Sequence, residues 1–477
     1  MAFVSVAFAV FLSVVFALYW LLGHKRRQAQ NLLLLTASFI FYGYWDWRFC
    51  FLLASSILLC YIGGIIMDLQ TCRRRKIWLT GLICVQLSSL LYFKYCNFFI
   101  ETFDLLLNDL GIKTSFVTLN IVLPLGVSFY TFHGLSYLFD VYNRKIHATR
   151  SLIDYGLFVS FFPLLVAGPI ERATHLLPQI EYQRQFNYSC AMDGFRQMLW
   201  GFFKKIVIAD NCAGYVDYIF SGYEHLQGSA LALGALLFSI QIYADFSGYS
   251  DIAIGCAKLF GINLLRNFSY PCFVRDIAEF WRHWHISLTT WFRDYVYIPL
   301  GGSRRSKWNT VRNTLIIFLL CGFWHGANWT FLAWAFIHVL LFLPLILFKK
   351  NRRYTDTIAA GRLFPNLKEF IQMLTTGTLV CFTWIFFRAE SVGTACNYIA
   401  EMFSAGLFEL PNEPVLKRAT LLAILGMFAA EWLQRTKEHA LQFSRLSGWA
   451  RGALCLVVLY AILWLSGEEQ EFIYFQF

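Results

Sequence analysis

The sequence predicts an all-α protein with many membrane-spanning helices, and three observations support this fold class. Of its 477 residues, 58% are hydrophobic and only 14% are charged, whereas soluble proteins carry about 25% charged residues. The mean hydropathy is +0.53. Apolar runs recur from residue 3 to residue 466, which predicts one polytopic membrane domain over residues 1–477 in place of several soluble domains. These observations exclude a soluble enzyme.

The basic residues are gathered in short clusters between the apolar runs. The formal net charge is +11, a value that can indicate a partner made of nucleic acid. However, the clusters at residues 25–27, 73–76 and 144–150 have the pattern of cytoplasmic loops in membrane proteins. We therefore expect no binding to nucleic acid.

The cysteines give no sign of a metal site or a disulfide framework. The sequence contains 13 of them, with no CxxC pair and no Cys/His cluster at metal-ligand spacing. Because most lie inside apolar runs, we expect them to be reduced and buried. Examples are Cys60, Cys84, Cys321, Cys381 and Cys455.

The distribution of Lys and Arg also predicts the orientation of the chain, because these residues mark cytoplasmic loops. The first apolar run, residues 2–23, precedes a basic cluster instead of following one, so we expect a retained helix with an extracytoplasmic N-terminus. Residues 258–312 and 349–353 are basic and should be cytoplasmic. Residues 152–260 should contain an even number of crossings. Later crossings, which leave the C-terminus extracytoplasmic, are expected near residues 371–388, 419–433 and 452–466.

A histidine in the next hairpin is expected at bilayer depth. Residues 313–348 must enter and leave the membrane with 36 residues, roughly 54 Å of helix against roughly 60 Å for two full crossings. The turn WHGAN, residues 324–328, should therefore lie below the outer surface. His325 is then either a core histidine bonded to a carbonyl or a functional group, and the adjacent Gly326 and Asn328 favour function. Packing is the expected role of four other histidines, His133, His147, His175 and His338.

The segment EFWRHWHISLTTWFRD, residues 279–294, predicts one amphipathic helix. Its apolar face would carry Trp281, Trp284, Leu288 and Trp291. His285 lies at the edge of that face, whereas His283 points to the polar side. An interfacial helix with its aromatic and arginine side chains at headgroup level would explain the stripe, but it would not explain His285.

Two carboxylates lie inside the apolar stretch from residue 231 to residue 260. The segment QIYADFSGYSD contains Asp245 and Asp251, with Ser247 between them. Acidic side chains inside a membrane are rare and need partners. They could orient a histidine, line a polar tunnel or brace a pair of helices.

The chain ends in GEEQEFIYFQF, residues 467–477. The acidic part should stay in water, but the aromatic tip is too apolar to do so, and we expect it to fold back onto the protein. Either this tip only packs, or it delivers Tyr474 into a cavity.

Two of these segments resemble signatures of the membrane-bound O-acyltransferase (MBOAT) superfamily, in particular its bacterial alginate O-acetyltransferase-like branch. Residues 279–302 are similar to one signature almost throughout, and GFWHGANWT, residues 322–330, is similar to the other. Weaker matches are LPLGVSFYTF at 123–132, AGPI at 167–170, KKIVIAD at 204–210 and DFSGYSD at 245–251. Together they define a signature core over residues 121–338.

The resemblance implies about 11 transmembrane helices, with re-entrant or interfacial helices, around a funnel through the bilayer. It also implies a catalytic histidine at His325, a second family histidine at His285 and an acyl-relaying tyrosine at Tyr474. His283 stands where relatives usually carry Arg, and Glu171 departs from a more apolar family pattern, so no role is carried over to either. Candidates for substrate or tunnel contacts are Asp245, Ser247, Asp251, Trp281, Trp324, Asn328, Arg282 and Arg293.

The implied function is that of an O-acetyltransferase of the bacterial inner membrane. Acetyl would pass from cytoplasmic acetyl-CoA, the donor substrate, to an extracytoplasmic polysaccharide such as alginate, another exopolysaccharide or a cell-wall glycan. We expect an extracytoplasmic SGNH-type acetyltransferase as partner, membrane lipid around the chain, and no bound cofactor or metal. The alternatives are D-alanyl transfer to a teichoic-acid-type acceptor, a transporter, and a scaffold of a polysaccharide export complex. The polysaccharide, the acyl group and the oligomeric state are left open.

Overall fold

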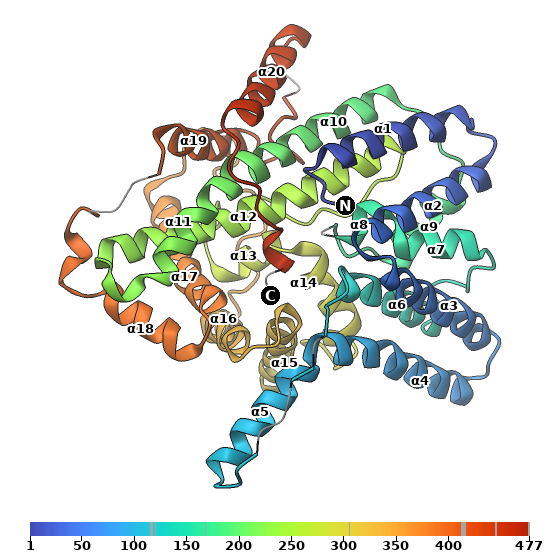
Figure 1. Ribbon diagram of the computed structural model, residues 1–477, viewed down its shortest axis with the longest axis horizontal. Helices are drawn as coiled ribbons and strands as arrows, with labels where there is room; N and C mark the ends of the chain where they lie inside the picture. The colour runs from blue at the N-terminus through green and yellow to red at the C-terminus, as the bar shows by residue number, and fades with distance from the viewer. Residues whose placement is uncertain are drawn as a thin grey trace. The chain divides into compact units, whose positions relative to one another are not determined.

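The computed structural model describes residues 1–114, 118–119, 121–166, 168–304, 306–411, 416–443 and 446–475, apart from the side chains of Cys72, Ala405 and Phe475. Every regular element in these ranges is a helix, as the sequence predicts (Figure 1). Ala167 of the AGPI motif, Arg305 of the basic region and the last two residues of the tail lie outside the described residues.

Five of the described helices are long and apolar enough to cross a membrane. They are Arg48–Asp68, Arg73–Asp109, Gly228–Leu259, Trp329–Leu347 and Leu367–Arg388. Two shorter apolar helices, Val6–Leu21 and Gly448–Trp464, coincide with predicted crossings. This pattern is that of a multi-pass membrane protein, while the total of about 11 spanning helices stays a prediction.

The described chain divides into two compact units. Unit 1 comprises residues 1–192 and 256–265, and unit 2 comprises residues 193–255 and 266–477. All candidate catalytic and tunnel residues from the sequence lie in unit 2. The candidate functional site therefore lies within unit 2.

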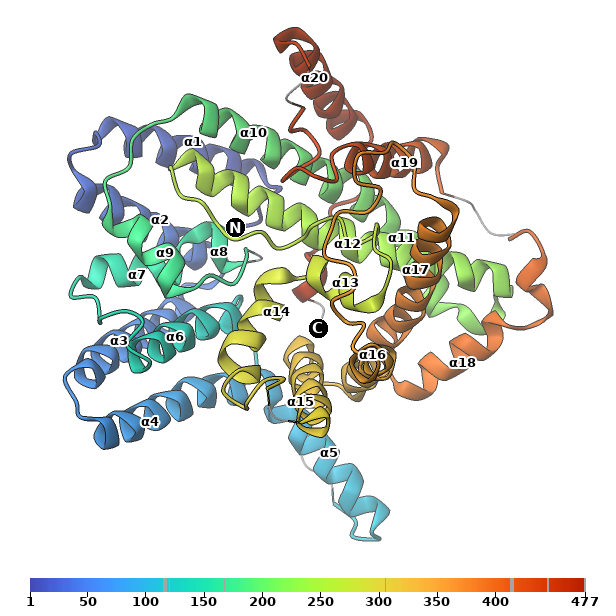
Figure 2. The same cartoon turned by 180° about the vertical axis from the view of Figure 1, so that it is seen from behind.

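Unit 1 is built from helices that pack on neighbours both near and far in sequence. They are α1 (Val6–Leu21), α2 (Arg27–Asp46), α3 (Arg48–Asp68), α4 (Cys72–Leu90), the π-helix η1 (Leu91–Tyr95), α5 (Cys96–Asp109), α6 (Val127–Tyr142), α7 (Leu152–Ser160), α8 (Phe162–Leu165) and α9 (Ala173–Glu181). Helices α3, α4 and α6 lie side by side, and α2 packs on α7 (Figures 1 and 2).

Three hydrogen bonds engage buried polar side chains of unit 1. Asp154 on α7 accepts a hydrogen bond of 2.7 Å from the amide of Asn31 on α2. The ring of His133 accepts one of 3.1 Å from the backbone N–H of Glu171. The Glu171 carboxylate lies 2.8 Å from Nδ1 of His175, and this hydrogen bond raises the pKa of His175. These contacts hold the helices of unit 1 together.

Unit 2 contains the remaining helices. They are most of α10 (Tyr188–Phe202), the π-helix η2 (Phe203–Ala209), α11 (Asp210–Ser221), η3 (Tyr223–His225), α12 (Gly228–Leu259) except its last turn, α13 (Ile277–His283), α14 (Ile286–Phe292), η4 (Arg293–Tyr297), α15 (Lys307–His325), α16 (Trp329–Leu347), α17 (Leu367–Arg388), α18 (Val392–Met402), η5 (Ala405–Phe408), α19 (Arg418–Leu433), α20 (Gly448–Trp464) and η6 (Ile473–Phe475).

Helix α12 is 32 residues long and buried along most of its length. It approaches α10 closely at a pair of glycines, because a Cβ atom built on Gly201 would lie 2.5 Å from the carbonyl oxygen of Gly248. Small residues let two helix backbones come this close. Helix α12 can therefore serve as the support on which the site is built.

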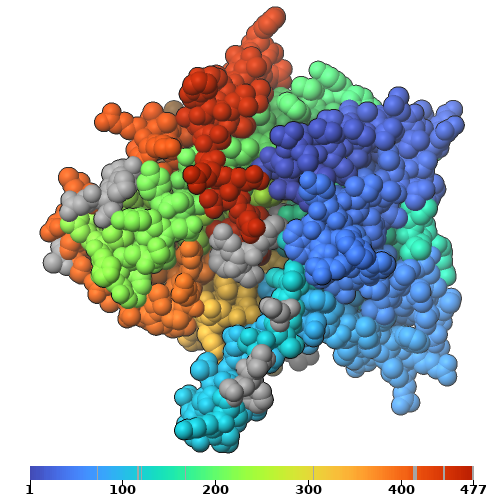
Figure 3. Space-filling view, in the orientation of Figure 1, coloured from blue at the N-terminus to red at the C-terminus, as the bar shows by residue number. Residues whose placement is uncertain are grey.

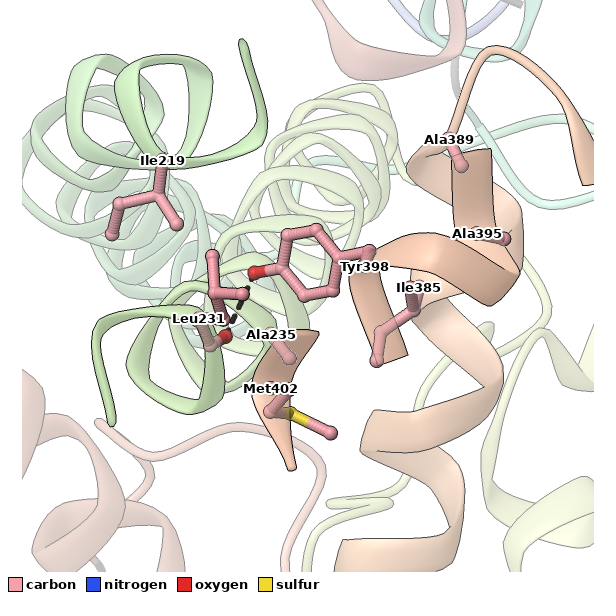
Figure 4. Packing of buried hydrophobic residues seen from close by; sticks show 8 residues of the cluster. All are labelled: Ile219, Leu231, Ala235, Ile385, Ala389, Ala395, Tyr398 and Met402. Carbon is pink, nitrogen blue, oxygen red and sulfur yellow. Dashed lines mark hydrogen bonds between the residues drawn. The ribbon is translucent and has the colours of Figure 1, made fainter. Parts of the chain in front are cut away.

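A hydrophobic cluster joins α11, α12, α17 and α18 (Figure 4). Tyr398 of α18 is almost fully buried in it, and its hydroxyl donates a hydrogen bond of 2.7 Å to the carbonyl oxygen of Leu231. Ile219, Ile385 and Met402 pack around the ring. Because Ile385 lies on α17, the cluster fixes the end of α17, which contributes Phe387 to the site described below.

Helices α15 and α16 form the hairpin that the sequence predicts between residues 313 and 348. His325 is the last residue of α15. A Cβ atom on Gly322 would lie 2.5 Å from the carbonyl oxygen of Phe331, so the two helices touch at their backbones. Asn328 caps α16 by accepting a hydrogen bond of 3.0 Å from the N–H of Thr330. The depth of His325 in a bilayer stays a prediction.

The prediction of one continuous helix over residues 279–294 is wrong. The chain forms α13 and α14 with a break between them, and His285 adopts a left-handed conformation with φ of 43°. Two hydrogen bonds impose the break: Ser269 N–H donates to His283 O at 3.0 Å, and Ile286 N–H donates to Asn267 O at 2.8 Å. The aromatic residues therefore do not form one straight stripe.

The described cysteines are free, and their burial differs from the expectation in one clear case. Cys60 and Cys321 are buried, while Cys381 and Cys455 are partly buried. Cys84 on α4 is exposed, so the prediction of a buried side chain is wrong there. An apolar run predicts a helix but not the direction in which each side chain points. The side chain of Cys84 points outward from α4.

Candidate active site

Aromatic rings from four elements of unit 2 surround the imidazole of His325, and we call this arrangement the box of rings. The side chain of His325 is buried, and its ring centroid lies 5.0 Å from that of Trp324, 5.2 Å from Trp334 on α16 and 5.3 Å from Phe387 on α17. Tyr474 closes the box at 5.4 Å. These apolar walls keep bulk water away from the imidazole, which strengthens the polar contacts that it makes.

The C-terminal tail brings a hydroxyl to this imidazole. In Figure 1 the dark red segment after α20 runs back over unit 2 and ends in η6. There the hydroxyl of Tyr474 forms a hydrogen bond with Nδ1 of His325. The tyrosine ring packs on Phe246 of α12 at 4.8 Å and on Trp324 at 5.8 Å. A base and a phenol are therefore held together at the centre of unit 2.

His285 lies beside this pair. Its ring centroid is 6.4 Å from that of His325 and 6.4 Å from that of Tyr474. The Nδ1 atom of His285 lies 2.9 Å from the amide oxygen of Asn267, whose NH₂ group donates to Ser250 at 3.0 Å. With these roles Nδ1 carries the hydrogen, and Nε2 is an acceptor. Among the described residues, that buried Nε2 has no hydrogen-bond partner.

The acidic segment of α12 is paired with two adjacent lysines of η2. The carboxylate of Asp245 lies 2.9 Å from the ammonium of Lys205. Asp251 lies 2.7 Å from the ammonium of Lys204, which also donates to Ser247 at 2.9 Å. All five side chains are largely buried. In the described part of the chain, no group of three or more His, Cys, Asp or Glu residues is arranged to hold a metal ion.

A separate cavity of about 910 Å³ opens between α13, α14, α15 and the segment after α16. Its wall carries several cations and many hydroxyl groups. The cations are Arg282, Arg293, Lys307, Lys349 and Arg352. Burial lowers the pKa of Arg282, but a guanidinium stays charged. The size lies in the range of ligand pockets, about 300–1,000 Å³, and the lining suits a polyanion.

Aromatic rings connect the wall of this cavity with the imidazole. Trp281 lines the cavity, and its ring lies 5.7 Å from that of Trp334, which touches His325. The indole N–H of Trp281 donates to His338 at 3.3 Å. His338 in turn lies 3.0 Å from the hydroxyl of Thr383, so it holds Trp281 in place.

The candidates from the sequence thus fall into separate groups. His325, His285, Tyr474 and Trp324 come together at one place. Asp245, Ser247 and Asp251 are engaged by lysines, and Trp281, Arg282 and Arg293 line the cationic cavity. Asn328 caps α16 and donates to Glu390 O at 3.0 Å. His283 is partly buried on the last turn of α13.

The sequence alone does not single out several residues of the site. Trp334 and Phe387 have no distinguishing context in their apolar runs. Asn267 lies in an irregular segment, where nothing indicates that it meets His285. The adjacent Lys204 and Lys205 were visible as two cations in an apolar stretch, and intramembrane cations point to buried partners.

Comparison with known proteins gives a consistent result. The family model of MBOAT, the membrane-bound O-acyltransferase family, matches residues 79–383. The chain is 40% identical over 417 residues to the probable alginate O-acetylase AlgI of Pseudomonas aeruginosa, which covers 87% of this chain and 76% of the relative. It is 30% identical to the peptidoglycan O-acetyltransferase of Helicobacter pylori, over 98% of this chain and 95% of that protein. A teichoic acid D-alanyltransferase of Bacillus subtilis is 27% identical over 57% of this chain and 70% of its own.

The apolar helices, the family match and the O-acetyltransferase relatives together identify an integral-membrane enzyme of the acyl-transfer type. The chain belongs to the membrane-bound O-acyltransferase family. It is a multi-pass O-acyltransferase, which confirms the class predicted from its motifs. The family match includes His285 and His325 and ends before Tyr474.

Proposed function

We propose that this protein transfers acetyl from cytoplasmic acetyl-CoA to Tyr474 and onward to an extracytoplasmic polysaccharide. The hydrogen bond between the Tyr474 hydroxyl and Nδ1 of His325 carries this proposal. A phenol that forms a hydrogen bond with a buried imidazole has the arrangement of a nucleophile and its general base. Packing of the aromatic tail alone would not require this contact.

The proposed step balances as follows. The Tyr474 oxygen attacks the thioester carbonyl while His325 takes the phenolic proton. The C–S bond breaks, and the departing CoA thiolate receives that proton from the imidazolium. Since a phenol has a pKa of about 10, it needs such a base near neutral pH. The product is an acetyl ester of Tyr474, whose phenolate is a good leaving group for the next transfer.

The cationic cavity is the proposed docking site for the donor. CoA carries several phosphate charges, and Arg293 and Lys307 line the cavity where those charges would meet cations. Trp281 lines the cavity and packs on Trp334, which packs on His325, so two ring contacts separate the cavity from the proposed base. We place this cavity on the cytoplasmic side and both chain termini outside, in the bacterial inner membrane.

The acceptor is proposed from the relatives. Their names specify alginate, peptidoglycan and teichoic acid, which are all extracytoplasmic polymers. A separate SGNH-type transferase would take acetyl from Tyr474 and place it on the polysaccharide. The same membrane step would then serve different polymers, with the partner selecting the acceptor.

The decisive experiment is to incubate the purified protein in nanodiscs with radiolabelled acetyl-CoA and to locate the label by mass spectrometry. We expect acetyl on Tyr474, and its loss in His325→Ala and in Tyr474→Phe. Tyr460→Phe is the matched control, because Tyr460 is an exposed tyrosine of α20. It should label as the wild type does.

Four other outcomes would change the proposal. Labelled acetyl-Tyr474 in the His325 variant would remove His325 as the base. CoA release without labelled protein would indicate direct transfer to the acceptor. Labelling only by a D-alanyl donor would replace acetyl as the acyl group. Solute flux without thioester consumption would favour a transporter.

A further inference from the structure

We propose that Lys205, Asp210 and Asp245 form a buried charge network that seats the C-terminal tail and so sets the position of the Tyr474 hydroxyl against His325. These are positioning residues, because they act on the nucleophile through the backbone of the tail. The inference rests on the proposed relay for its catalytic meaning. The seating of the tail can be tested separately.

The network consists of one cation between two carboxylates. The ammonium of Lys205 lies 2.8 Å from Asp210 and 2.9 Å from Asp245. The three side chains are between 1% and 3% exposed. Buried ions destabilise a protein unless each finds hydrogen bonds that replace water. One ammonium cannot supply all the donors that two carboxylates need, so further partners are required.

The tail supplies those partners from its backbone. The N–H of Ile473 donates a hydrogen bond of 2.7 Å to Oδ2 of Asp245. The carbonyl oxygen of Gln470 accepts one of 2.9 Å from the ammonium of Lys205. If the tail left, the network would lose one donor and one acceptor inside a buried site. Charge-assisted hydrogen bonds of this kind are about twice as strong as neutral ones.

The network acts directly next to the nucleophile. Ile473 precedes Tyr474 in the chain, so the bond to Asp245 fixes the peptide that carries the phenol. Phe472 is buried and packs on Tyr249, one turn after Asp245 on α12, with ring centroids 4.4 Å apart. Helix α12 therefore provides both a charged and an aromatic contact for the tail.

The upstream end of the tail is attached to the same region. Gly467 N–H donates to the carbonyl oxygen of Ile206 at 3.2 Å, and Asn211 donates to that of Leu465 at 2.8 Å. A Cβ atom on Gly467 would lie 2.8 Å from the backbone nitrogen of Asn211, so the tail crosses η2 and α11 in close contact. The tail is thus tethered before and after its acidic stretch.

The π-helix η2 contains a matched second network. The adjacent Lys204 contacts Asp251 at 2.7 Å and Glu431 at 3.9 Å, instead of the tail. Both lysines are buried and both pair with a carboxylate of α12. The two pairs differ in whether they bind the tail, so Asp251→Asn is a control for the loss of a buried ion pair.

Tail seating can be measured with a glutamate-specific protease on the full chain in nanodiscs. Glu468, Glu469 and Glu471 are exposed, and Figure 3 shows the red C-terminal segment on one face of the molecule. A tethered segment resists cleavage, since proteolysis follows the population of the open form. We expect cleavage in this stretch to rise by about tenfold or more in Asp245→Asn, and Asp251→Asn to keep the wild-type rate.

A tail variant carries the same test without a change in the three charged side chains of the network. Ile473→Pro removes the N–H that donates a hydrogen bond to Asp245. Pro is tolerated at the start of a helical turn such as η6. Ile473→Ala keeps that N–H and removes only the buried side chain. We expect faster cleavage for Pro than for Ala. This comparison decides the matter even if Asp245→Asn fails to fold.

Acyl transfer provides the second readout. In Asp245→Asn and Ile473→Pro, acetyl-Tyr474 formation at saturating acetyl-CoA should slow by about tenfold or more, with KM for acetyl-CoA unchanged. The double variant should lose less than the product of the two single losses, because both changes weaken the same contact between Asp245 and the Ile473 N–H. If the rate losses of the two single variants multiply in the double variant, the two changes act on separate contacts, which would refute the hydrogen bond between Asp245 and Ile473 as their common target.

Failure of the seat and failure of the relay give different results. Wild-type cleavage rates in both Asp245→Asn and Ile473→Pro would overturn the seat. Tyr474→Phe keeps the Ile473 N–H and should stay protected from the protease. If no form acquires acetyl on Tyr474 while Asp245→Asn still releases the tail, the relay is refuted and the seat stands.

Discussion

The orientation of a single imidazole depends on an amide that lies 18 residues earlier in the chain. Asn267 is fully buried, and its side-chain oxygen accepts from His285 at 2.9 Å and from Ser287 at 3.0 Å. With Nδ1 bound in this way, Nε2 is the unprotonated nitrogen of a ring whose centroid lies 6.4 Å from that of Tyr474. One asparagine thus sets the tautomer of His285.

The loss of stability should depend on whether the asparagine or one of its hydrogen-bond donors is replaced. Asn267→Leu leaves two buried donors without their acceptor, and each unsatisfied group costs about 1–3 kcal/mol. Ser287→Ala removes one donor and leaves His285 bonded, so its effect should be smaller. In thermal unfolding in detergent, the wild type should have the highest melting temperature, Ser287→Ala a lower one and Asn267→Leu the lowest. Equal melting temperatures for the two variants would contradict the assigned roles.

At the scale of elements, the close contact of α15 with α16 is what places His325 in its box of rings. The two helices meet where Gly322 faces the backbone of Phe331, and Phe331 packs on Phe387 with ring centroids 4.8 Å apart. A wider separation of the helices would move His325 away from Trp334 and Phe387. The backbone contact and the ring contacts of His325 are therefore coupled.

Gly322→Ala should damage both stability and activity. Its new Cβ atom would lie 2.5 Å from the carbonyl oxygen of Phe331, and backbone cannot yield as a side chain can. Overpacking of this kind costs about 1–3 kcal/mol. Gly377→Ala on α17 is the control, because nothing lies within 4 Å of its Cβ position and alanine favours the helix. Melting temperature and CoA release should fall for position 322 and hold for position 377.

At the scale of the whole molecule, the distribution of charge predicts which loops face the cytoplasm. The segment after α16 is basic from Lys349 to Arg353, and α5 ends in an acidic stretch near Asp109. Both Asp109 and Lys350 are exposed. Since Lys and Arg are retained inside, the two positions should lie on opposite sides of the membrane.

This orientation can be checked with a membrane-impermeant maleimide on spheroplasts. The cysteines that are exposed in the described part of the chain, Cys84, Cys272 and Cys396, would first be replaced by Ser, and this parent protein serves as the blank. Asp109→Cys should be labelled in intact spheroplasts, and Lys350→Cys only after permeabilisation. The reverse pattern would invert the proposed topology and place the cationic cavity outside.

The sequence by itself determined the class of protein, the helical hairpin and the residues that carry the family signatures. Composition fixes the membrane environment, and the period of apolar residues fixes helices, because both are local properties of the chain. His325 could be singled out for the same reason: a polar group beside glycine in an apolar hairpin is conspicuous in the sequence alone.

Only the tertiary structure decided how these parts meet. The break at His285 is imposed by hydrogen bonds with Asn267 and Ser269, and the local sequence does not predict it. The contact of Tyr474 with His325 joins positions 149 residues apart, and the pairing of Lys205 with the tail joins positions 265 apart. Local sequence specifies what each segment can form. Long-range packing selects which buried donor meets which acceptor, because burial makes an unpaired polar group too costly to keep.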